Sequence, residues 1–447
     1  MELIFSQIIE KKSIRLWTNT NNRAEYEKVR RIIGKDVKNV LDNEKISEAL
    51  LSNSVGSLAG KGDLILLHDP SDIRKKHSKE LEGLGKVLSL EKQVINGYSS
   101  FNTVAVDVYG KDLTLLGTEI YSNKMPNYVT QEELKKQEKP CSEEATEEER
   151  QRYEEVTKRV SERDYINLSV ITKKQLKQMS DRLKNTAGIG ELTHVLDRGF
   201  DDGSLFDFID NELKDKFVIR LKLSRVTNEI EINTEGKKRA IKINEHNFAE
   251  SQVVSYQKLM IKNKVYQDIK CIVQFGYKLD GYSVIKIQLN NREGKELFKQ
   301  PMLLVSNNEV RTGEEALIVY RVYLKRSKIE GVFKFLKDVL GWEEFQIRDF
   351  DSIKALLTLC YFIAGYFYEI ESVLIEQDFI QFVAHLGGGK GKVTRFYILN
   401  GFAQLFTKNK VDAAIEEHQI TPEKLKEIMR FAKMMQKGVL ELGDEYA

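Results

Sequence analysis

Cysteine is scarce in this chain, and its placement argues against two classes of site. Cys141, Cys271 and Cys360 are widely separated within 447 residues, and no CxxC pair or Cys/His cluster occurs. This spacing argues against a zinc site and against a disulfide framework, and it suits a protein of the reducing cytoplasm. The glycine-rich stretch 387–392 does not match GxxxxGK[ST], so a P-loop is excluded as well.

Long hydrophobic runs are also missing. The first residues, MELIFSQ, lack a basic stretch followed by an apolar core, so we expect no signal peptide. The most apolar run, 355–368, is shorter than the ~20 residues that a membrane span requires. Charged residues at 354, 369 and 371 bound this run, which predicts a buried helix.

The overall composition is that of a globular protein with local basic character. Hydrophobic residues make up 41% and charged residues 31% of the chain, and the net charge is +2. The length allows two or three domains, or one domain with a large insertion. Basic residues gather in the middle of the chain, where they would neutralise DNA phosphates, although a plain soluble surface explains any single one equally well. They are Lys216, Arg220, Lys222, Arg225, Lys237, Lys238, Arg239, Lys242, Lys258, Lys262, Lys264 and Lys270.

The most informative segment is 323–337, which reads Y-x2-R-x3-E-x6-K. At about 100° per residue, Arg326, Glu330 and Lys337 fall within roughly 40° of one another on a helix. Apolar residues centre on a neighbouring face, so one face packs on a core and the other presents a carboxylate between two cations. Such a group indicates chemistry on nucleic acid. The alternative is a solvated i,i+4 ion pair between Arg326 and Glu330.

Two further carboxylates follow short apolar runs that are typical of buried strands. The run 64–67 leads into His68, Asp69 and Pro70, and because proline cannot donate to a strand ladder, we expect the strand to stop there. The run 192–196 ends at Asp197. Two aspartates at strand ends and a glutamate on a later helix suit a hard cation such as Mg²⁺.

Neighbouring residues leave some roles open. Asp72 competes with Asp69 for the first carboxylate position, and we prefer Asp69 because it lies where the apolar run ends. His68 and His194 lie near the two aspartates, and we expect them to be orienting or core residues rather than metal ligands.

These segments resemble those of DDE transposases of insertion-sequence family four. The string at 323–337 matches the signature of that family at all four positions. Asp197 and Arg198, followed by a helical pattern at 205–213 and a strand-like run at 217–221, are similar to the segment around the second aspartate of the family. Asp69, which precedes 80–86, is similar to the first. The resemblance covers roughly residues 60–375.

The resemblance implies an α/β fold, a ribonuclease-H-like core interrupted by a β-rich insertion, with helical N- and C-terminal parts. It makes Asp69, Asp197 and Glu330 the catalytic triad that binds two Mg²⁺ ions, with Mn²⁺ as a substitute. The residues that it assigns to DNA are Tyr323, Arg326, Lys337, Arg198 and Arg220.

The implied activity is cleavage of the ends of an insertion sequence and their joining to target DNA by two-metal phosphoryl transfer. The implied partners are double-stranded DNA with terminal inverted repeats, target DNA and a second copy of the chain as a homodimer on DNA, in the nucleoid of a bacterial cytoplasm. Two alternatives remain, a transposase-derived DNA-binding protein without catalysis and a metal-dependent nuclease. The presence of all three acids argues against the first alternative. The cations around Glu330 and the long β-rich insertion argue against the second.

Two positions depart from the family pattern. Ser327 stands where relatives often have a tryptophan after the signature arginine, and the only tryptophans, Trp17 and Trp342, lie outside the insertion. A flipped base would therefore need another aromatic ring, for which the candidates are Phe275, Tyr277 and Tyr282.

Five segments follow from these anchors: a helical module for DNA-end binding over 1–60, the first part of the core over 61–224, the β-rich insertion over 225–308, the second part of the core over 309–376, and a C-terminal helical region for dimerisation over 377–447. We expect core strands at 102–108 and 113–120, insertion strands at 230–233, 240–243, 269–276, 282–289 and 302–305, and helices at 166–187 and 425–440.

Residues 130–165 are highly charged, and T-x-x-E capping boxes at Thr130 and Thr146 predict a solvated helical excursion, with a partner-binding arm as the alternative.

Overall fold

The computed structural model describes residues 2–16, 20, 23–33, 43–137, 140–142, 145–232, 238–261, 264–373, 375–417 and 419–426. Trp17 and most of the helix expected over 425–440 lie outside this part of the chain. The chain divides into two compact units. A terminal unit comprises Met1–Lys12 and Ile375–Ala447, and a main unit comprises Ser13–Leu374.

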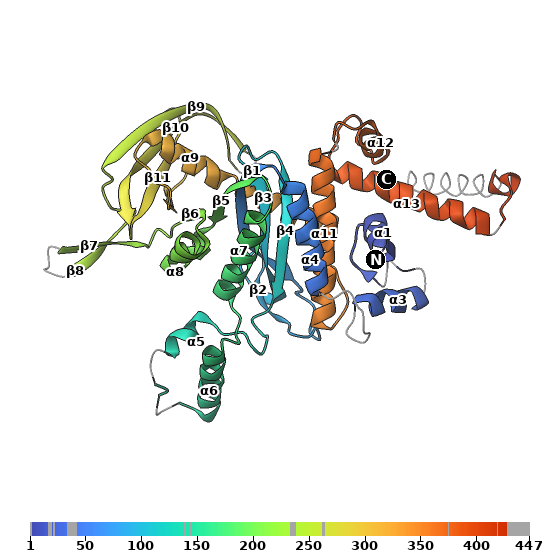
Figure 1. The fold of residues 1–447 in the computed structure, drawn as a ribbon, viewed down its shortest axis with the longest axis horizontal. Helices are drawn as coiled ribbons and strands as arrows, with labels where there is room; N and C mark the ends of the chain where they lie inside the picture. Colours follow the sequence, from blue (N-terminus) through green and yellow to red (C-terminus); the bar gives the residue numbers. More distant parts are fainter. Residues whose placement is uncertain are drawn as a thin grey trace, which may run out of the picture. The chain divides into compact units, whose positions relative to one another are not determined.

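A ten-stranded mixed sheet forms the centre of the main unit (Figure 1). Its order is β2-β3-β1-β5-β6-β12-β11-β10-β9, and β4 pairs with β3. Strands β1, β5 and β6 run parallel, whereas β1 with β3, β3 with β4 and β6 with β12 are antiparallel. The strand bounds are β1 Gly62–Arg74, β2 Gly85–Leu88, β3 Val94–Asp107, β4 Leu113–Tyr121, β5 Ile189–Leu196, β6 Lys216–Arg220, β9 Glu250–Ile261, β10 Lys264–Leu279, β11 Tyr282–Asn290 and β12 Met302–Ser306.

Helices cover this sheet. Two of them, α4 (Asn43–Leu58) and α11 (Phe350–Val373), pack against β4 and against each other, while α7 (Leu168–Lys184) contacts β3, β4 and β5. Leu51 and Leu58 of α4 are buried against Leu66 and Leu116 of the sheet. The helix α4, from the segment expected to be an N-terminal module, therefore contributes directly to the core of the main unit, as does the shorter α3 (Arg23–Ile33), which contacts α11.

The apolar run at 355–368 lies in α11, as predicted. Its segment Phe350–Ser372 is, among the described residues, the helix long and apolar enough to cross a membrane by length and composition. Most of its apolar window, 72%, is buried inside the protein. A core helix of a globular unit meets the same criterion.

The strand that carries Asp69 is longer than predicted. We expected it to stop at Pro70, but β1 continues to Arg74, and Pro70 pairs with Phe101 of β3. The parallel register with β5 ends at Leu67, so beyond this residue β1 has β3 as its partner. A residue without an N–H group is tolerated where one side of a strand is unpaired.

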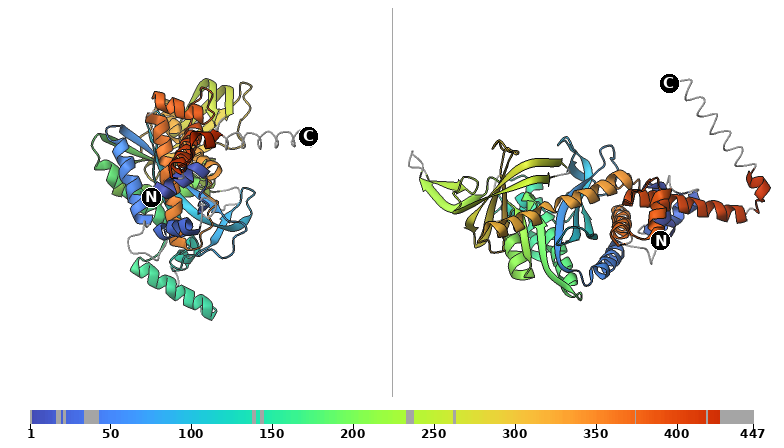
Figure 2. Two further views of the ribbon diagram at one scale, coloured as in Figure 1. Left: turned by 90° about the vertical axis from the view of Figure 1, so that its right-hand side faces the viewer. Right: turned by 90° about the horizontal axis from the view of Figure 1, so that it is seen from above.

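The charged excursion forms two helices, α5 (Gln131–Lys136) and α6 (Glu147–Glu162), and α6 projects away from the sheet (Figures 1 and 2). Both capping boxes are present, because Thr130 accepts from the backbone of Glu133 and Thr146 from that of Glu149. Arg152 links the two helices through an ion pair of 2.8 Å with Glu133. The helical prediction is thus confirmed.

The β-rich segment extends the same sheet. Strand β12 pairs with β6, and β11, β10 and β9 follow outward. Strand β9 was not predicted, whereas a strand is present at each position where one was predicted in this segment. The remaining pair, β7 (Val226–Ile232) and β8 (Lys238–Lys242), forms a separate two-stranded ribbon.

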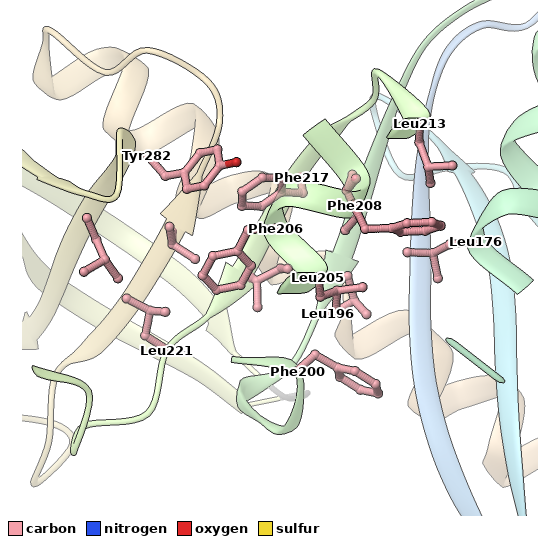
Figure 3. Close-up of a cluster of buried hydrophobic side chains, with 14 of the residues drawn as sticks. Leu176, Leu196, Phe200, Leu205, Phe206, Phe208, Leu213, Phe217, Leu221 and Tyr282 are labelled. Atoms are coloured by element: carbon pink, nitrogen blue, oxygen red, sulfur yellow. The ribbon is translucent and has the colours of Figure 1, made fainter. Parts of the chain in front are cut away.

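An aromatic cluster lies where β6 meets the extension (Figure 3). The ring of Phe217 on β6 stacks on Phe206 at 5.4 Å and meets Tyr282 of β11 edge-on at 5.3 Å. Phe206 belongs to α8 (Gly203–Asp207), which continues as a π-helical segment, Phe208–Leu213. The predicted helix at 205–213 is therefore present, with a widened second half.

In the terminal unit, α1 (Glu2–Lys11) and α12 (Asp378–Leu386) both pack on α13 (Arg395–Glu417). Lys12 donates to the side chain of Asn400 at 3.0 Å, and Glu10 forms an ion pair with Lys410. The first helix of the chain thus joins the last ones.

Candidate active site

Strands β1 and β5 deliver two aspartates to one edge of the sheet. Their parallel register runs from Leu64 opposite Leu192 to Leu67 opposite Val195. Asp69 and Asp197 each lie two residues beyond the last pair, so the register places them at equivalent positions on neighbouring strands. Parallel strands end at the same edge of a sheet, and side chains at such an edge commonly form sites.

The third carboxylate comes from the segment after the extension. Helix α9 (Gly313–Leu324) ends before Arg326, and α10 (Ser327–Lys334) carries Glu330. A capping box at Thr312 begins α9, and its buried face includes Tyr320 and Tyr323.

The guanidinium of Arg326 joins all three carboxylates. Its Nη2 lies 2.8 Å from Oδ1 of Asp69 and 3.7 Å from Oδ2 of Asp197, and its Nη1 lies 3.4 Å from Oε1 of Glu330. The Arg326 side chain is only 15% exposed. The i,i+4 pair considered as an alternative does form, but it is one contact of a half-buried cluster of four charges.

The two aspartates differ in pKa although they share this arginine. The pKa of Asp69 is raised to about 6: burial is the largest cause, Arg326 opposes it, and the charges of Asp197 and Glu330 act in the same direction as burial. Burial also acts to raise the pKa of Asp197, but the charge of Arg326, the backbone N–H of Arg198 and the Tyr323 hydroxyl together hold it below its usual range. Both groups are therefore anionic at neutral pH, and Asp69 carries the less stabilised charge.

Tyr323 and Arg220 complete the surroundings of Asp197. The Tyr323 hydroxyl donates to Oδ1 of Asp197 at 2.9 Å, and burial together with that carboxylate raises the pKa of the phenol. Nη1 of Arg220, at the end of β6, lies 3.9 Å from the same oxygen. Arg198 is exposed beside them. Asp197, Arg198, Arg220 and Lys222 all line a cavity of about 540 Å³.

Lys337 is held differently from the prediction. Residues Phe335–Val339 form a π-helical segment, whose wider turn changes the 100° spacing that places Arg326, Glu330 and Lys337 on one face. Nζ of Lys337 donates to the carbonyl oxygen of Asp72 and lies 3.1 Å from Oε1 of Glu343. Lys337 thus joins this segment to β1, at the strand that carries Asp69.

Asp72, the competing carboxylate, points elsewhere. Its Oδ2 accepts the backbone N–H of Leu88 at 3.2 Å, and none of its contacts involves Arg326. Asn102 of β3, which sequence reasoning missed, is paired with Asp69 and donates to its carbonyl oxygen at 3.2 Å. Only the strand register could have identified Asn102.

The candidate rings for a flipped base are mostly unavailable. Phe275 and Tyr282 are 6% and 8% exposed, and the Tyr282 hydroxyl donates to Asp207 at 2.9 Å. The ring of Tyr277, which is half-buried, lies 4.4 Å from that of His246. Trp342 is fully buried, and its indole N–H donates to the carbonyl oxygen of Leu357.

The three acids suit a divalent cation by donor type. Carboxylate oxygens are the ligands that Mg²⁺ prefers, and the high pKa of Asp69 marks an anion that its surroundings stabilise poorly. Within the described residues no group of three or more His, Cys, Asp or Glu side chains is close enough to enclose a metal ion. The guanidinium of Arg326 supplies positive charge between the carboxylates.

Comparison with known proteins agrees with this geometry. No sequence in a search of curated proteins matches the chain. Residues 169–365 match a protein-family model described as "Transposase DDE domain". The matched range contains Asp197 and the whole segment 323–337, whereas Asp69 precedes it, and a mixed α/β fold with a large sheet is consistent with this domain. The match supports a transposase function in the broad sense: residues 169–365 are similar to the DDE domain of transposases.

Proposed function

We propose that this chain is a DDE transposase of insertion-sequence family four, which cleaves the ends of its element and joins them to target DNA. The observation that carries the proposal is the grouping of Asp69, Asp197 and Glu330 around Arg326 in a chain matched to a DDE domain. The mixed sheet, with acids at the ends of parallel strands, supports a ribonuclease-H-like core as part of this proposal.

Asp69, Asp197 and Glu330 would hold the divalent ions, two Mg²⁺ with Mn²⁺ as a substitute. Such ions lower the pKa of a water nucleophile and stabilise the attacking and leaving oxygens at phosphorus. The residues themselves supply the anionic oxygens. Burial destabilises the Asp69 anion, and the single guanidinium of Arg326 offsets this only in part. The carboxylate should therefore bind a divalent cation more favourably than a well-solvated aspartate would.

Arg326 has two tasks in this proposal. In the chain alone its single positive charge offsets part of the repulsion among the three carboxylates that it contacts. When the carboxylates are neutralised by other cations, the guanidinium is released to bind a DNA phosphate with its planar pair of N–H donors. In this proposal the same side chain thus holds the carboxylates together and binds the substrate.

The DNA contacts that we propose lie around Asp197. Arg198 and Arg220 line the cavity beside this carboxylate, so they can bind the phosphates that flank a scissile bond. Tyr323 orients Asp197 through its hydroxyl, and Lys337 adds positive charge near β1. Terminal inverted repeats, target DNA and a homodimer on DNA belong to the same proposal, with DNA-end binding assigned to residues 1–60 and dimerisation to residues 377–447.

The decisive experiment is strand cleavage on DNA that carries the element's own ends. The native chain is incubated with Mg²⁺, Mn²⁺ or EDTA, and Glu330→Gln is compared with Glu314→Gln, an exposed glutamate in the first turn of α9. We expect metal-dependent cleavage at the repeat boundary, followed by joining, which Glu330→Gln lowers by at least 10³-fold and Glu314→Gln leaves intact.

Each alternative function predicts a different outcome of the same experiment. Specific binding of the ends without cleavage under any metal would identify a DNA-binding protein that has lost catalysis. Cleavage without joining, and without preference for the repeat boundary, would identify a metal-dependent nuclease. Either result would refute the transposase proposal.

A further inference from the structure

A chain of hydrogen bonds crosses the sheet directly behind the candidate active site. Nδ1 of His68 lies 2.9 Å from Oγ1 of Thr103, Nε2 of His68 lies 2.9 Å from Nδ1 of His194, and Nε2 of His194 lies 3.0 Å from Oδ2 of Asp215. The first three side chains are 0% exposed and Asp215 is 2% exposed. Three neighbouring strands and the residue before β6 thus share one polar path through a core, where every unpaired group is costly.

Helix α7 supplies side chains at both ends of this series of hydrogen bonds. At one end, the side-chain amide of Gln175 donates to Oγ1 of Thr103 at 3.0 Å. At the other end, Asp215 accepts from the hydroxyl of Ser180 at 2.6 Å, and Nζ of Lys184 lies 2.6 Å from its Oδ1. Burial acts to raise the pKa of Asp215, but the His194, Lys184 and Ser180 side chains hold it below its usual range. The series of hydrogen bonds therefore ends at a carboxylate anion, Asp215.

These end groups determine which atom of each ring carries hydrogen. Because Asp215 is an anion, Nε2 of His194 donates to it, which leaves Nδ1 of a neutral His194 as an acceptor. Nε2 of His68 must then donate to His194, and Nδ1 of His68 must accept from the Thr103 hydroxyl. The hydroxyl is free to donate there because its oxygen already accepts from Gln175. When both rings are uncharged, each histidine is therefore the Nε2–H tautomer, and all donors along this series of hydrogen bonds point toward Asp215.

The position of the His68–His194 bond relates it to the metal-binding carboxylates. The backbone register between β1 and β5 ends at Leu67 opposite Val195. His68 is the next residue on β1, whereas His194 lies inside the ladder, opposite Leu66, so their bond runs diagonally across the last backbone pairs. Asp69 comes immediately after His68, and because side chains alternate along a strand, it faces the opposite side of the sheet.

We propose that Thr103, His68, His194 and Asp215 form a positioning network, in which this ordered hydrogen-bond chain sets the separation of the Asp69 and Asp197 carboxylates. The inference rests on the proposed function, because it assigns these carboxylates to metal binding. The network acts through the strands: the bond between the two imidazoles spans the last backbone pairs of the ladder and holds β1 and β5 together just before each one delivers its aspartate.

The test compares two substitutions of Thr103, a residue that touches neither the carboxylates nor Arg326. Thr103→Val keeps the side-chain shape but removes the hydroxyl, which leaves Nδ1 of His68 without its donor. Thr103→Ser keeps the hydroxyl and serves as the matched control. Three measurements are made: ¹⁵N NMR of the imidazole nitrogens in the metal-free chain, Mn²⁺ binding followed by the electron paramagnetic resonance of the free ion, and cleavage of DNA ends against Mg²⁺ concentration.

We expect the native chain to show Nε2–H tautomers for His68 and His194. Thr103→Val should alter these ¹⁵N signals, weaken Mn²⁺ binding about tenfold and raise the Mg²⁺ concentration for half-maximal cleavage by a similar factor, while the affinity for DNA ends is unchanged. Thr103→Ser should behave like the native chain. If Thr103→Val does not fold, Gln175→Met, which removes the donor to Thr103, is used and should shift the same three measurements in the same direction.

Three results would overturn the inference. They are other tautomers in the native chain, Mn²⁺ binding that is unaffected in a folded variant with altered ¹⁵N signals, and a loss of thermal stability as the sole effect of Thr103→Val. Failure of the proposed function is distinguishable from these. A native chain that binds Mn²⁺, loses it on Thr103→Val and yet cleaves no DNA would retain the network and refute the transposase.

Discussion

Asp69 and Asp197 show how the surroundings of a residue decide its chemistry. Both are aspartates two positions beyond the same strand ladder, and both contact Arg326. Asp197 also accepts from a phenol and a backbone N–H, whereas Asp69 has stronger burial and two carboxylates nearby. The protein therefore stabilises the anion of Asp197, whereas the anion of Asp69 has too little positive charge nearby to offset its burial.

Replacement of Asp69 by asparagine should stabilise the metal-free chain at neutral pH. The pKa of Asp69 is about 6 when folded, above its unfolded value, so the folded state holds this proton more tightly. Stability is therefore lost as the pH rises from about 4 to about 6, by about 3 kcal/mol in all, and stays constant above that range. Asparagine has no such loss, so the free energy of unfolding of Asp69→Asn should exceed that of the native chain at pH 7.5.

The measurement is urea denaturation in EDTA at several pH values between 4 and 8. The advantage of Asp69→Asn should shrink toward pH 4, where the aspartate is protonated in the folded state and about half protonated in the unfolded state. A difference between the two chains that does not change with pH would contradict the assignment of a high pKa to this carboxyl group.

At the scale of elements, the signature segment is not one helix. Tyr323 lies near the end of α9, Arg326 lies between α9 and α10, Glu330 lies on α10, and Lys337 lies in the π-helical segment. The break after Leu324 allows Arg326 to reach toward Asp69 while Tyr323 reaches Asp197. The four signature residues therefore reach the site from different parts of the backbone rather than from one face of a single helix.

Lys337 joins the π-helical segment to β1, so its removal should affect stability as well as DNA binding. Lys337→Ala loses the hydrogen bond to the Asp72 carbonyl and the ion pair with Glu343, at a cost of about 1–3 kcal/mol for bonds from a charged group. If Lys337 also contacts a phosphate, the slope of log K against log salt for DNA-end binding should fall by about 1. Lys334→Ala, an exposed lysine on the adjacent turn, is the control.

Denaturation and binding at several salt concentrations separate these roles. A lower free energy of unfolding with an unchanged salt slope would leave Lys337 with a structural role alone. A change in neither quantity would contradict both contacts.

At the scale of the main unit, the β-rich segment is built into the core sheet. The pairing of β12 with β6 makes one continuous sheet, and the cluster of Phe206, Phe217 and Tyr282 fills the space beside this junction (Figure 3). Because buried residues from both parts contribute to one core, we expect the main unit to unfold as a single cooperative unit rather than as a core with an independent insertion.

Tyr282 tests this expectation. Tyr282→Ala removes a buried ring and should lower the free energy of unfolding by about 3–5 kcal/mol, as for other large aromatic deletions. Tyr282→Phe keeps the ring, loses only the hydrogen bond to Asp207 and should cost about 1 kcal/mol. Hydrogen exchange should show that amides in β5 and in β10 lose protection together in Tyr282→Ala. Loss of protection in β10 alone would show that the two parts unfold independently.

Local patterns predicted much of this molecule. Apolar runs identified β5 and β6, T-x-x-E patterns identified the starts of α5 and α6, and an apolar run bounded by charges identified α11. Strand β9 was missed, because its side chains are mostly exposed and show no sustained apolar run. The extension of β1 through Pro70 was also missed, since whether proline is tolerated depends on which side of the strand is paired.

The sequence by itself determined which side chains are available and where several elements begin: the acids after two apolar runs, the arginine and glutamate four residues apart, and the caps. Only the tertiary structure decided which of these side chains meet. Arg326 contacts Asp69 across 257 positions of the chain, and His68 contacts His194 across 126. Helical and strand periodicities reflect interactions between near neighbours in sequence, whereas strand register and core packing bring distant segments together, and these contacts set the charges and hydrogen bonds of the site.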